Sequence, residues 1–275
     1  MRQLLTTALF TLLFTASALA DPYADAVAAH PERWQQVLDA LDPDARGMKP
    51  VFAAAKAGRD GEALRRLEAH FEISPAGEPF RSLTWGPAKE SDALRAMTQG
   101  TFTAQRVTRT ALMDAEGRID WNWVPDDTSD QWTHFLNRFG HLSFLVRAAR
   151  DLGDPYLGFV NRYLRDWVAT NPRPRPDVTE PDPGHPGGPY NKGKSDLNPH
   201  FYAWLGLNVG IRLEYWVPGF FQMLKHDVME PETLVVMLAS LAEQAEYLRL
   251  FHGFEMSNHG TTQMRNLLGL TNAFP

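Results

Sequence analysis

An amide, an imidazole and a glycine stand side by side near the end of the chain, at Asn258, His259 and Gly260. A fixed amide donor can share the charge of a carboxylate, which makes it easier to remove a proton from the neighbouring carbon. Histidine has a pKa near neutrality, which suits proton transfer. The pair predicts a site that grips a carboxylate and moves a proton. On the sequence alone, an alternative stays open: Asn258 caps the final helix and His259 is simply exposed.

Three further side chains are candidates for holding a substrate. Arg212 lies in an apolar helical stretch, where an unpaired charge is costly, so it needs a partner such as Glu214 or a sugar carboxylate. Tyr202 and Trp204 follow a proline-rich stretch and could stack on a sugar ring. Burial in the core is the alternative for both aromatic side chains.

No metal or cofactor is predicted. His134 and His141 are seven residues apart within one predicted helix, as are His252 and His259 in the sequence, but neither pair has carboxylates in a ligand pattern. The chain has no glycine-rich phosphate loop, no serine elbow and no dinucleotide fingerprint.

Composition narrows the class of partner. The net charge of −6 argues against nucleic acid but only weakly against acidic sugars, because a local basic pocket can bind them. Eight tryptophans and seven tyrosines supply aromatic faces that suit sugar rings. The chain has no cysteine, so disulfide and thiol chemistry are excluded.

The first twenty residues predict a secretory signal peptide. Met1 and Arg2 are followed by a short apolar run from Leu4 to Leu19, and Ala18-Leu19-Ala20 forms a small-x-small cleavage site. A membrane anchor is the alternative, but the run is short for a span. We therefore expect a periplasmic or secreted protein that occupies 21–275 and has no membrane partner after the signal is removed.

Helical periodicity dominates the rest of the chain, which predicts an all-α fold of successive helical hairpins. The strongest patterns predict one helix at about 130–152, another directly after Pro155, and two long ones at about 201–226 and 230–251. Residues 75–130 predict irregular structure, with a short helix near Ser91–Met97. The stretch 171–199 is rich in proline and glycine, so it predicts a long loop, either a mobile surface segment or a rim over a binding cleft.

An ordered set of motifs resembles the heparinase II/III-like polysaccharide lyases, which include heparan sulfate and oligoalginate lyases. The motifs are Ile119-Asp120-Trp121, Gln131 to Arg138, Asp151 to Tyr156, Leu164 to Pro172, Trp204, Gly210 to Trp216, and Ser257-Asn258-His259. The resemblance implies an N-terminal incomplete α/α toroid followed by a β-sandwich, so 21–275 is expected to be a toroid portion truncated before the rest of the enzyme.

The resemblance also implies cleavage of a uronic-acid polysaccharide, heparan-sulfate-like or alginate-like, by β-elimination. Asn258 would neutralise the uronate carboxylate, and His259 would contact it or transfer a proton. The family's catalytic tyrosine would lie beyond Pro275, in the missing C-terminal part, because no tyrosine of this sequence matches it. Two other functions stay open. One is an inverting glycoside hydrolase, which needs two facing carboxylates, with Asp120, Glu214 and Glu255 as candidates. The other is a non-catalytic carbohydrate-binding helical module.

Overall fold

The structure is a computed structural model, and it describes residues 20–104, 106–125, 130–174, 201–251 and 258–274. Most of the predicted signal peptide and most of the predicted loop at 171–199 lie outside these ranges. Among the described helices, none is long and apolar enough to cross a membrane.

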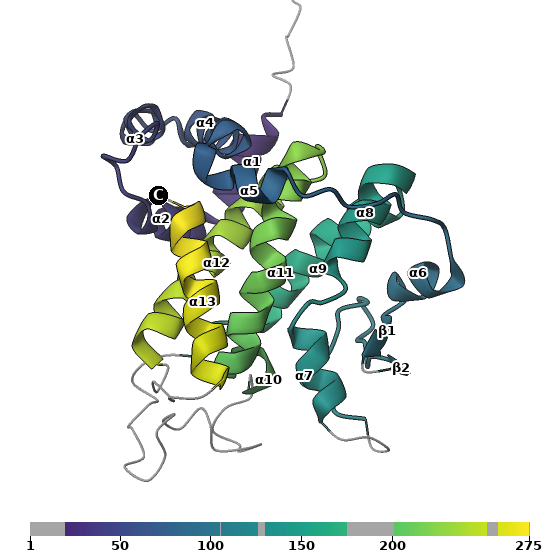
Figure 1. Ribbon diagram of the computed structural model, residues 1–275. Helices are drawn as coiled ribbons and strands as arrows, with labels where there is room; N and C mark the ends of the chain where they lie inside the picture. Colours follow the sequence, from purple (N-terminus) through teal and green to yellow (C-terminus); the bar gives the residue numbers. More distant parts are fainter. Residues whose placement is uncertain (1–19, 105, 126–129, 175–200, 252–257, 275) are drawn as a thin grey trace, which may run out of the picture.

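The described chain is mainly helical and contains one small two-stranded sheet, which confirms the all-α prediction (Figure 1). Its elements are α1 (Pro22–Ala29), α2 (Pro31–Ala40), α3 (Lys49–Lys56), α4 (Asp60–Ile73), the 3-10 turn η1 (Pro75–Gly77), α5 (Glu78–Arg81), α6 (Asp92–Met97), β1 (Thr101–Ala104), β2 (Val107–Thr110), α7 (Gln131–Asn137), α8 (Leu142–Leu152), α9 (Tyr156–Thr170), α10 (Phe201–Trp204), α11 (Gly206–Lys225), α12 (Pro231–Phe251) and α13 (Asn258–Ala273).

The two long helices α11 and α12 form the centre of the molecule. On α11 pack α13, α8, α7 and α10, whereas α12 packs against α2, α1 and α9. Figure 1 shows α11 between α13 on one side and α7 on the other, with α10 at the lower end of α11. Nearly every buried position of α11 from Val209 to Leu224 is apolar or aromatic, and this burial drives the association.

The predicted helix at 130–152 is in fact two helices. α7 ends at Asn137 and α8 begins at Leu142, because Phe139 takes a left-handed backbone conformation with a φ of 60°. The Phe139 ring is fully buried; it stacks on Trp121 at 5.5 Å and meets Trp216 edge-on at 5.2 Å. Tertiary packing therefore overrides the helical pattern here, and His134 and His141 do not share a helix.

Proline divides the N-terminal helical region. α1 and α2 are separated at His30, since Pro31 cannot donate the backbone hydrogen bond that a continuous helix needs. The short hairpin β1–β2 lies within 75–130, where the sequence predicts no strand, whereas the short helix expected near Ser91–Met97 is present as α6. The two strands pair Thr101 with Thr110 and Thr103 with Thr108, and the threonine hydroxyls of each pair are 2.8 and 2.7 Å apart.

A histidine–tyrosine pair joins α8 to α9. His141 Nε2 and the Tyr163 hydroxyl are 2.5 Å apart, and the imidazole packs against the rings of Phe102 and Phe139. Desolvation in this aromatic setting lowers the pKa of His141 to about 3. The imidazole is therefore neutral in the folded protein at ordinary pH.

We expect this pair to make the protein acid-sensitive. Between the ordinary histidine pKa of 6.5 and about 3, the unfolded chain binds a proton at His141 that the folded chain does not bind. The free energy of unfolding should therefore fall as the pH drops through that window, by up to about 1.4 kcal/mol per pH unit. Urea unfolding at about pH 7 and about pH 4.5 measures this slope, and His141→Gln should flatten it. Equal slopes for the two proteins would contradict the assignment.

Candidate active site at the start of α13

Asn258 is the first residue of α13 and His259 is the second, and both side chains are exposed. The helix therefore begins at the Asn258-His259 motif itself. The Thr262 hydroxyl donates to the Asn258 backbone carbonyl at 3.0 Å, which ties the first turn together. In the described part of the chain, no hydrogen bond uses the Asn258 side-chain amide. That amide stands at the positive end of the helix dipole, where a carboxylate is favoured.

The position of α13 is set by its contact with α11. Gly206 and Gly210 face Gln263 so closely that a Cβ on Gly210 would lie 3.1 Å from the Gln263 Cα, and one on Gly206 would lie 2.8 Å from its Nε2. Farther along, Arg265 pairs with Glu214 at 2.7 Å. Phe274 then packs edge-on against Phe220, with ring centroids 5.2 Å apart. The two helices therefore run side by side in the same direction. Because Gln263 is level with Gly206 and Gly210, the first turn of α13 extends past the N-terminal end of α11.

Tyr202 and Trp204 belong to α10, directly before α11, and both are buried. The Trp204 indole donates to the carbonyl of Asn171 at 3.0 Å, and its ring meets Tyr247 edge-on at 5.2 Å. Burial, together with the nearby Asp130 carboxylate, raises the pKa of Tyr202 to about 12. These contacts hold both aromatic rings inside the protein, which is the alternative that the sequence left open. Stacking on a sugar stays a prediction for both.

Arg212 lies in the second turn of α11 and is fully buried. Its Nη1 donates to the carbonyls of Asn137 at 3.1 Å and Ala203 at 2.8 Å, while Nε donates to Gln244 Oε1 at 2.9 Å. The guanidinium lies 4.1 Å from the centroid of Trp167. None of the salt bridges in the described residues includes it, so Glu214 is not its partner. Arg212 thus ties α7, α9, α10, α11 and α12 together beneath the candidate site, and a sugar contact for it also stays a prediction.

A buried amide, Asn208, organises the surface between α7 and α11. Its Nδ2 donates to the Tyr202 carbonyl at 2.8 Å and lies 2.8 Å from His134 Nδ1, and its Oδ1 accepts from Arg138 Nε at 2.7 Å. Because the amide nitrogen can only donate, His134 Nδ1 is the acceptor and its proton sits on Nε2. Burial lowers the pKa of His134, which favours the neutral imidazole that this hydrogen bond requires.

The structure brings the predicted residues to one end of the molecule without joining them in a single cluster. Tyr202 and Trp204 lie on α10, Arg212 lies inside α11, and Asn258 and His259 begin α13. Asn208 and Arg138 were not predicted from the sequence as site residues. Asn208 carries a detectable signal, because a polar residue on the buried face of an apolar helix requires polar partners.

The carboxylates that a glycoside hydrolase would use do not form a pair in the described residues. Glu214 is engaged with Arg265, and the exposed Asp120 accepts a hydrogen bond from the Asn122 backbone at 3.0 Å. Glu255 lies outside the described residues. Within the described ranges, no group of three or more histidine or acidic side chains could hold a metal ion.

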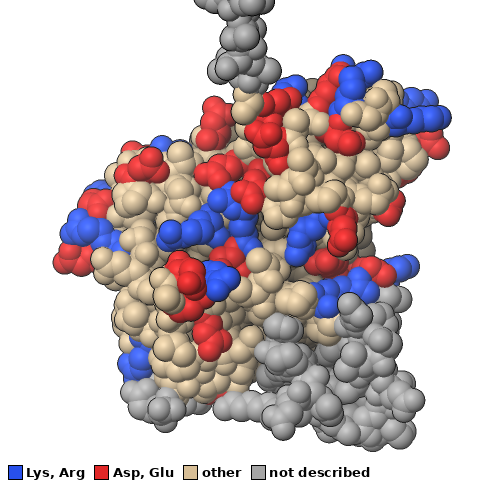
Figure 2. All heavy atoms as spheres, turned by 180° about the vertical axis from the view of Figure 1, so that it is seen from behind, with Lys and Arg blue, Asp and Glu red and all other residues tan. Residues whose placement is uncertain are grey.

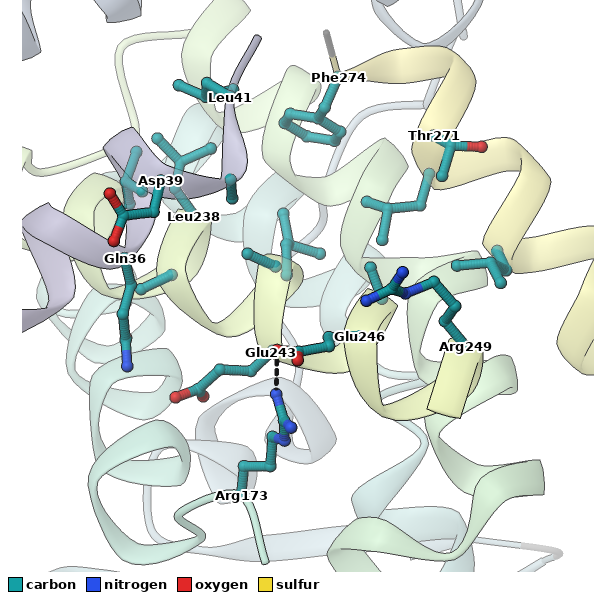
Figure 3. Close-up of a pocket in the computed structure, with 18 of the residues that line it drawn as sticks. Gln36, Asp39, Leu41, Arg173, Leu238, Glu243, Glu246, Arg249, Thr271 and Phe274 are labelled. Carbon is teal, nitrogen blue, oxygen red and sulfur yellow. Dashed lines mark hydrogen bonds and ion pairs between the residues drawn. The ribbon is translucent and has the colours of Figure 1, made fainter. Parts of the chain in front are cut away.

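A separate cavity of about 790 Å³ lies between α2, α12 and the second half of α13 (Figure 3). Its walls are mainly apolar, with Leu238 and Phe274 among them, and an ion pair of Arg173 with Glu246 crosses one side. Leu267, the first residue of α13 to line it, is nine positions from Asn258, or roughly 13 Å along the helix. The cavity is therefore distinct from the candidate active site.

Comparison with known proteins identifies the family. Residues 37–275 match the model described as heparinase II/III N-terminus. A heparin-sulfate lyase of Bacteroides stercoris is 25% identical over 220 residues, which cover 78% of this chain and 32% of that protein. A second heparin-sulfate lyase, from Bacteroides thetaiotaomicron, is 22% identical over 225 residues and is covered to 29%. The chain thus spans about a third of the length of these relatives.

Solved structures show the same fold. A heparan sulfate lyase from Pedobacter heparinus superposes on 84% of this chain with a TM-score of 0.60 and 18% identity, and 34% of that structure is covered. A heparinase III superposes on 87% of the chain with a TM-score of 0.68 and 18% identity, and 37% of it is covered. The helical hairpins are those of an incomplete α/α toroid, as the sequence predicts. The chain belongs to the heparinase II/III family and corresponds to the N-terminal toroid portion of its members.

Proposed function

We propose that this chain is the N-terminal part of a lyase that cleaves a uronic-acid polysaccharide by β-elimination. The observation that carries the proposal is the placement of Asn258. Its amide is exposed at the positive end of α13, and no side chain of the described residues forms a hydrogen bond with it. Membership of a family whose curated relatives are heparin-sulfate lyases supports the reaction class.

In this mechanism Asn258 donates to the carboxylate of the uronate whose C5 loses its proton. The negative charge that develops at C5 is shared by the carboxylate, and the amide and the α13 dipole stabilise it there. The electron pair then forms the C4–C5 double bond and breaks the bond from C4 to the bridging oxygen, which takes up a proton. His259 is the adjacent group able to contact the carboxylate or transfer a proton.

The remaining groups are expected in polypeptide beyond this chain. The resemblance to the family assigns proton transfer to a tyrosine that this sequence lacks at a matching position, and the match covers only 32% and 29% of the length of the two relatives. We propose that the C-terminal part of the same enzyme supplies this tyrosine and the β-sandwich.

The proposal is tested by incubating the full-length gene product with heparan sulfate and with alginate. A lyase produces an unsaturated uronate at the new non-reducing end, so the ultraviolet absorbance should rise as the chains shorten. Shortening with new reducing ends but no rise in absorbance would show hydrolysis and reject the lyase. Binding without shortening would favour the carbohydrate-binding module.

Export to the periplasm is part of the proposal. Asp21 caps α1 by accepting from the Tyr23 backbone at 3.1 Å and pairs with Arg65 at 2.7 Å, so α1 begins directly after the predicted cleavage site. Expression in a Gram-negative host should give a periplasmic protein whose N-terminal residue is Asp21. A cytoplasmic protein that retains Met1 would contradict export.

A further inference from the structure

Arg138 stands out among the cationic side chains near the candidate site. Much of the surface charge is mutually neutralised: positive and negative residues lie interleaved on the face in Figure 2, and many arginines pair with carboxylates, as Arg118 does with Asp114 at 2.7 Å. Arg138 has no such pair in the described part of the chain. Its Nε is held by Asn208 Oδ1 at 2.7 Å, and its guanidinium lies 4.6 Å from the centroid of the Phe135 ring.

This anchoring leaves one edge of the guanidinium unused. Nε is committed to the buried Asn208, and the ring of Phe135 covers one face, whereas no hydrogen bond of Nη1 or Nη2 is found within the described residues. The side chain is half-buried, so the group is partly dehydrated yet reachable from solvent. An arginine held in this way presents two parallel donors, which match the two oxygens of a carboxylate or a sulfate.

Arg138 and Asn258 border the same surface from opposite sides. Leu207, Ile211, Glu214 and Pro218 recur at helical spacing and form the partly or fully exposed strip of α11. Gly206 and Gly210 beside that strip contact α13, and Asn208 on the other side contacts α7. We call this strip, with α7 and α13 on its two borders, the α7–α13 face; Figure 1 shows the three helices in this order.

The width of the α7–α13 face excludes a single shared ligand group. Neighbouring packed helices are roughly 8–10 Å apart, so α7 and α13 are separated by about two such spacings. One uronate carboxylate therefore cannot meet both Arg138 and Asn258. An extended acidic polysaccharide carries a negative group on successive sugar residues, so it can reach both.

We propose that Arg138 binds an oxyanion of the polysaccharide, carboxylate or sulfate, on a different sugar residue from the one whose carboxylate meets Asn258. The inference rests on the proposed function, since it takes an acidic polysaccharide as the ligand. Asn208 is the positioning residue, because it holds the guanidinium at Nε and holds the α10 backbone at the Tyr202 carbonyl. Arg138 thus selects substrates by charge away from the reacting bond.

The test measures binding and turnover of the full-length gene product with two size-defined uronate oligosaccharide series, one sulfated and one unsulfated. Arg138→Gln should weaken binding about tenfold or more, as expected for a lost charge-assisted bidentate contact. KM should rise while kcat stays within about threefold. Arg138→Lys should fall between, because it keeps the charge but loses the fork.

Arg147→Gln is the matched control. Arg147 is also half-buried, lies 4.7 Å from the Phe144 ring centroid and has no carboxylate pair among the described residues, but it lies on α8. Its replacement should leave binding unchanged. Equal weakening of both series by Arg138→Gln identifies a carboxylate as the group, and weakening of the sulfated series alone identifies a sulfate.

Two outcomes overturn the inference and are distinguishable. If Arg138→Gln binds both series as tightly as the unmodified protein while Asn258→Ala loses turnover, the Arg138 site is wrong and the proposed function stands. If the unmodified protein neither binds nor cleaves either series, both fail. Circular dichroism of each variant verifies that it is folded.

Discussion

Asn258→Ala should lower kcat of the full-length enzyme by about 10²–10³-fold, the loss typical of removing one preorganised donor to a developing anion. KM should change much less, because the amide gains most of its interaction energy as negative charge moves onto the carboxylate. Initial rates of the ultraviolet absorbance increase, measured over a range of uronate polysaccharide concentrations, separate the two parameters.

Asn272→Ala provides the matched control. It is the same substitution on the same helix, at an exposed position near the opposite end, and should leave both constants unchanged. A kcat for Asn258→Ala within about threefold of the unmodified enzyme would remove Asn258 from the chemistry. A large rise in KM with unchanged kcat would instead assign it to substrate binding alone.

Arg212→Met should destabilise the protein by about 3–5 kcal/mol. The substitution leaves the carbonyls of Asn137 and Ala203 and the Gln244 side-chain oxygen buried without their donor, at roughly 1–3 kcal/mol for each group. The contact of the cation with Trp167 is also lost. Relief from burying a charge offsets part of this cost, which keeps the net below the sum. Guanidinium unfolding followed by circular dichroism measures the difference.

Arg265→Met is the comparison for this substitution. Arg265 pairs with Glu214 at the surface, and such exposed pairs contribute about 0–1 kcal/mol. A loss for Arg212→Met no larger than that for Arg265→Met would mean that α7, α10 and α12 do not depend on Arg212. The buried hydrogen bonds would then have other donors in the variant.

The sequence predicts the helical class well because apolar periodicity is a property of each segment on its own. Helices ending or starting at proline or glycine, such as α9 after Pro155 and α12 at Pro231, follow from local chemistry. The break between α7 and α8 does not, because it depends on a pocket for the Phe139 ring built by Trp121 and Trp216 from elsewhere in the chain. The local sequence around Phe139 does not show this pocket, because the pocket forms only when the chain folds.

The candidate site shows the same division. The prediction for Asn258 and His259 follows from their residue types and from the family resemblance, whereas the proposal for Arg138 depends on a contact with a residue seventy positions away in the sequence. Asn208 reaches Arg138 across the α7–α11 contact. Arg212 illustrates the converse, since its cost of burial is readable from the sequence but its backbone-carbonyl partners are not.

The glycine contact between α11 and α13 fixes the position of Asn258 along α11. Gln263 is five residues from Asn258, or roughly 7–8 Å along the helix, and Gly206 and Gly210 allow the Gln263 turn to pack closely against α11. The distance of the Asn258 amide from this contact is therefore set by the helix. A bulkier side chain at Gly210 would meet the backbone of Gln263, which cannot rotate away as a side chain can. α13 would then have to slide or tilt. The Asn258 amide would be displaced from the proposed position of the substrate carboxylate, although no polar side chain of the candidate site had been changed.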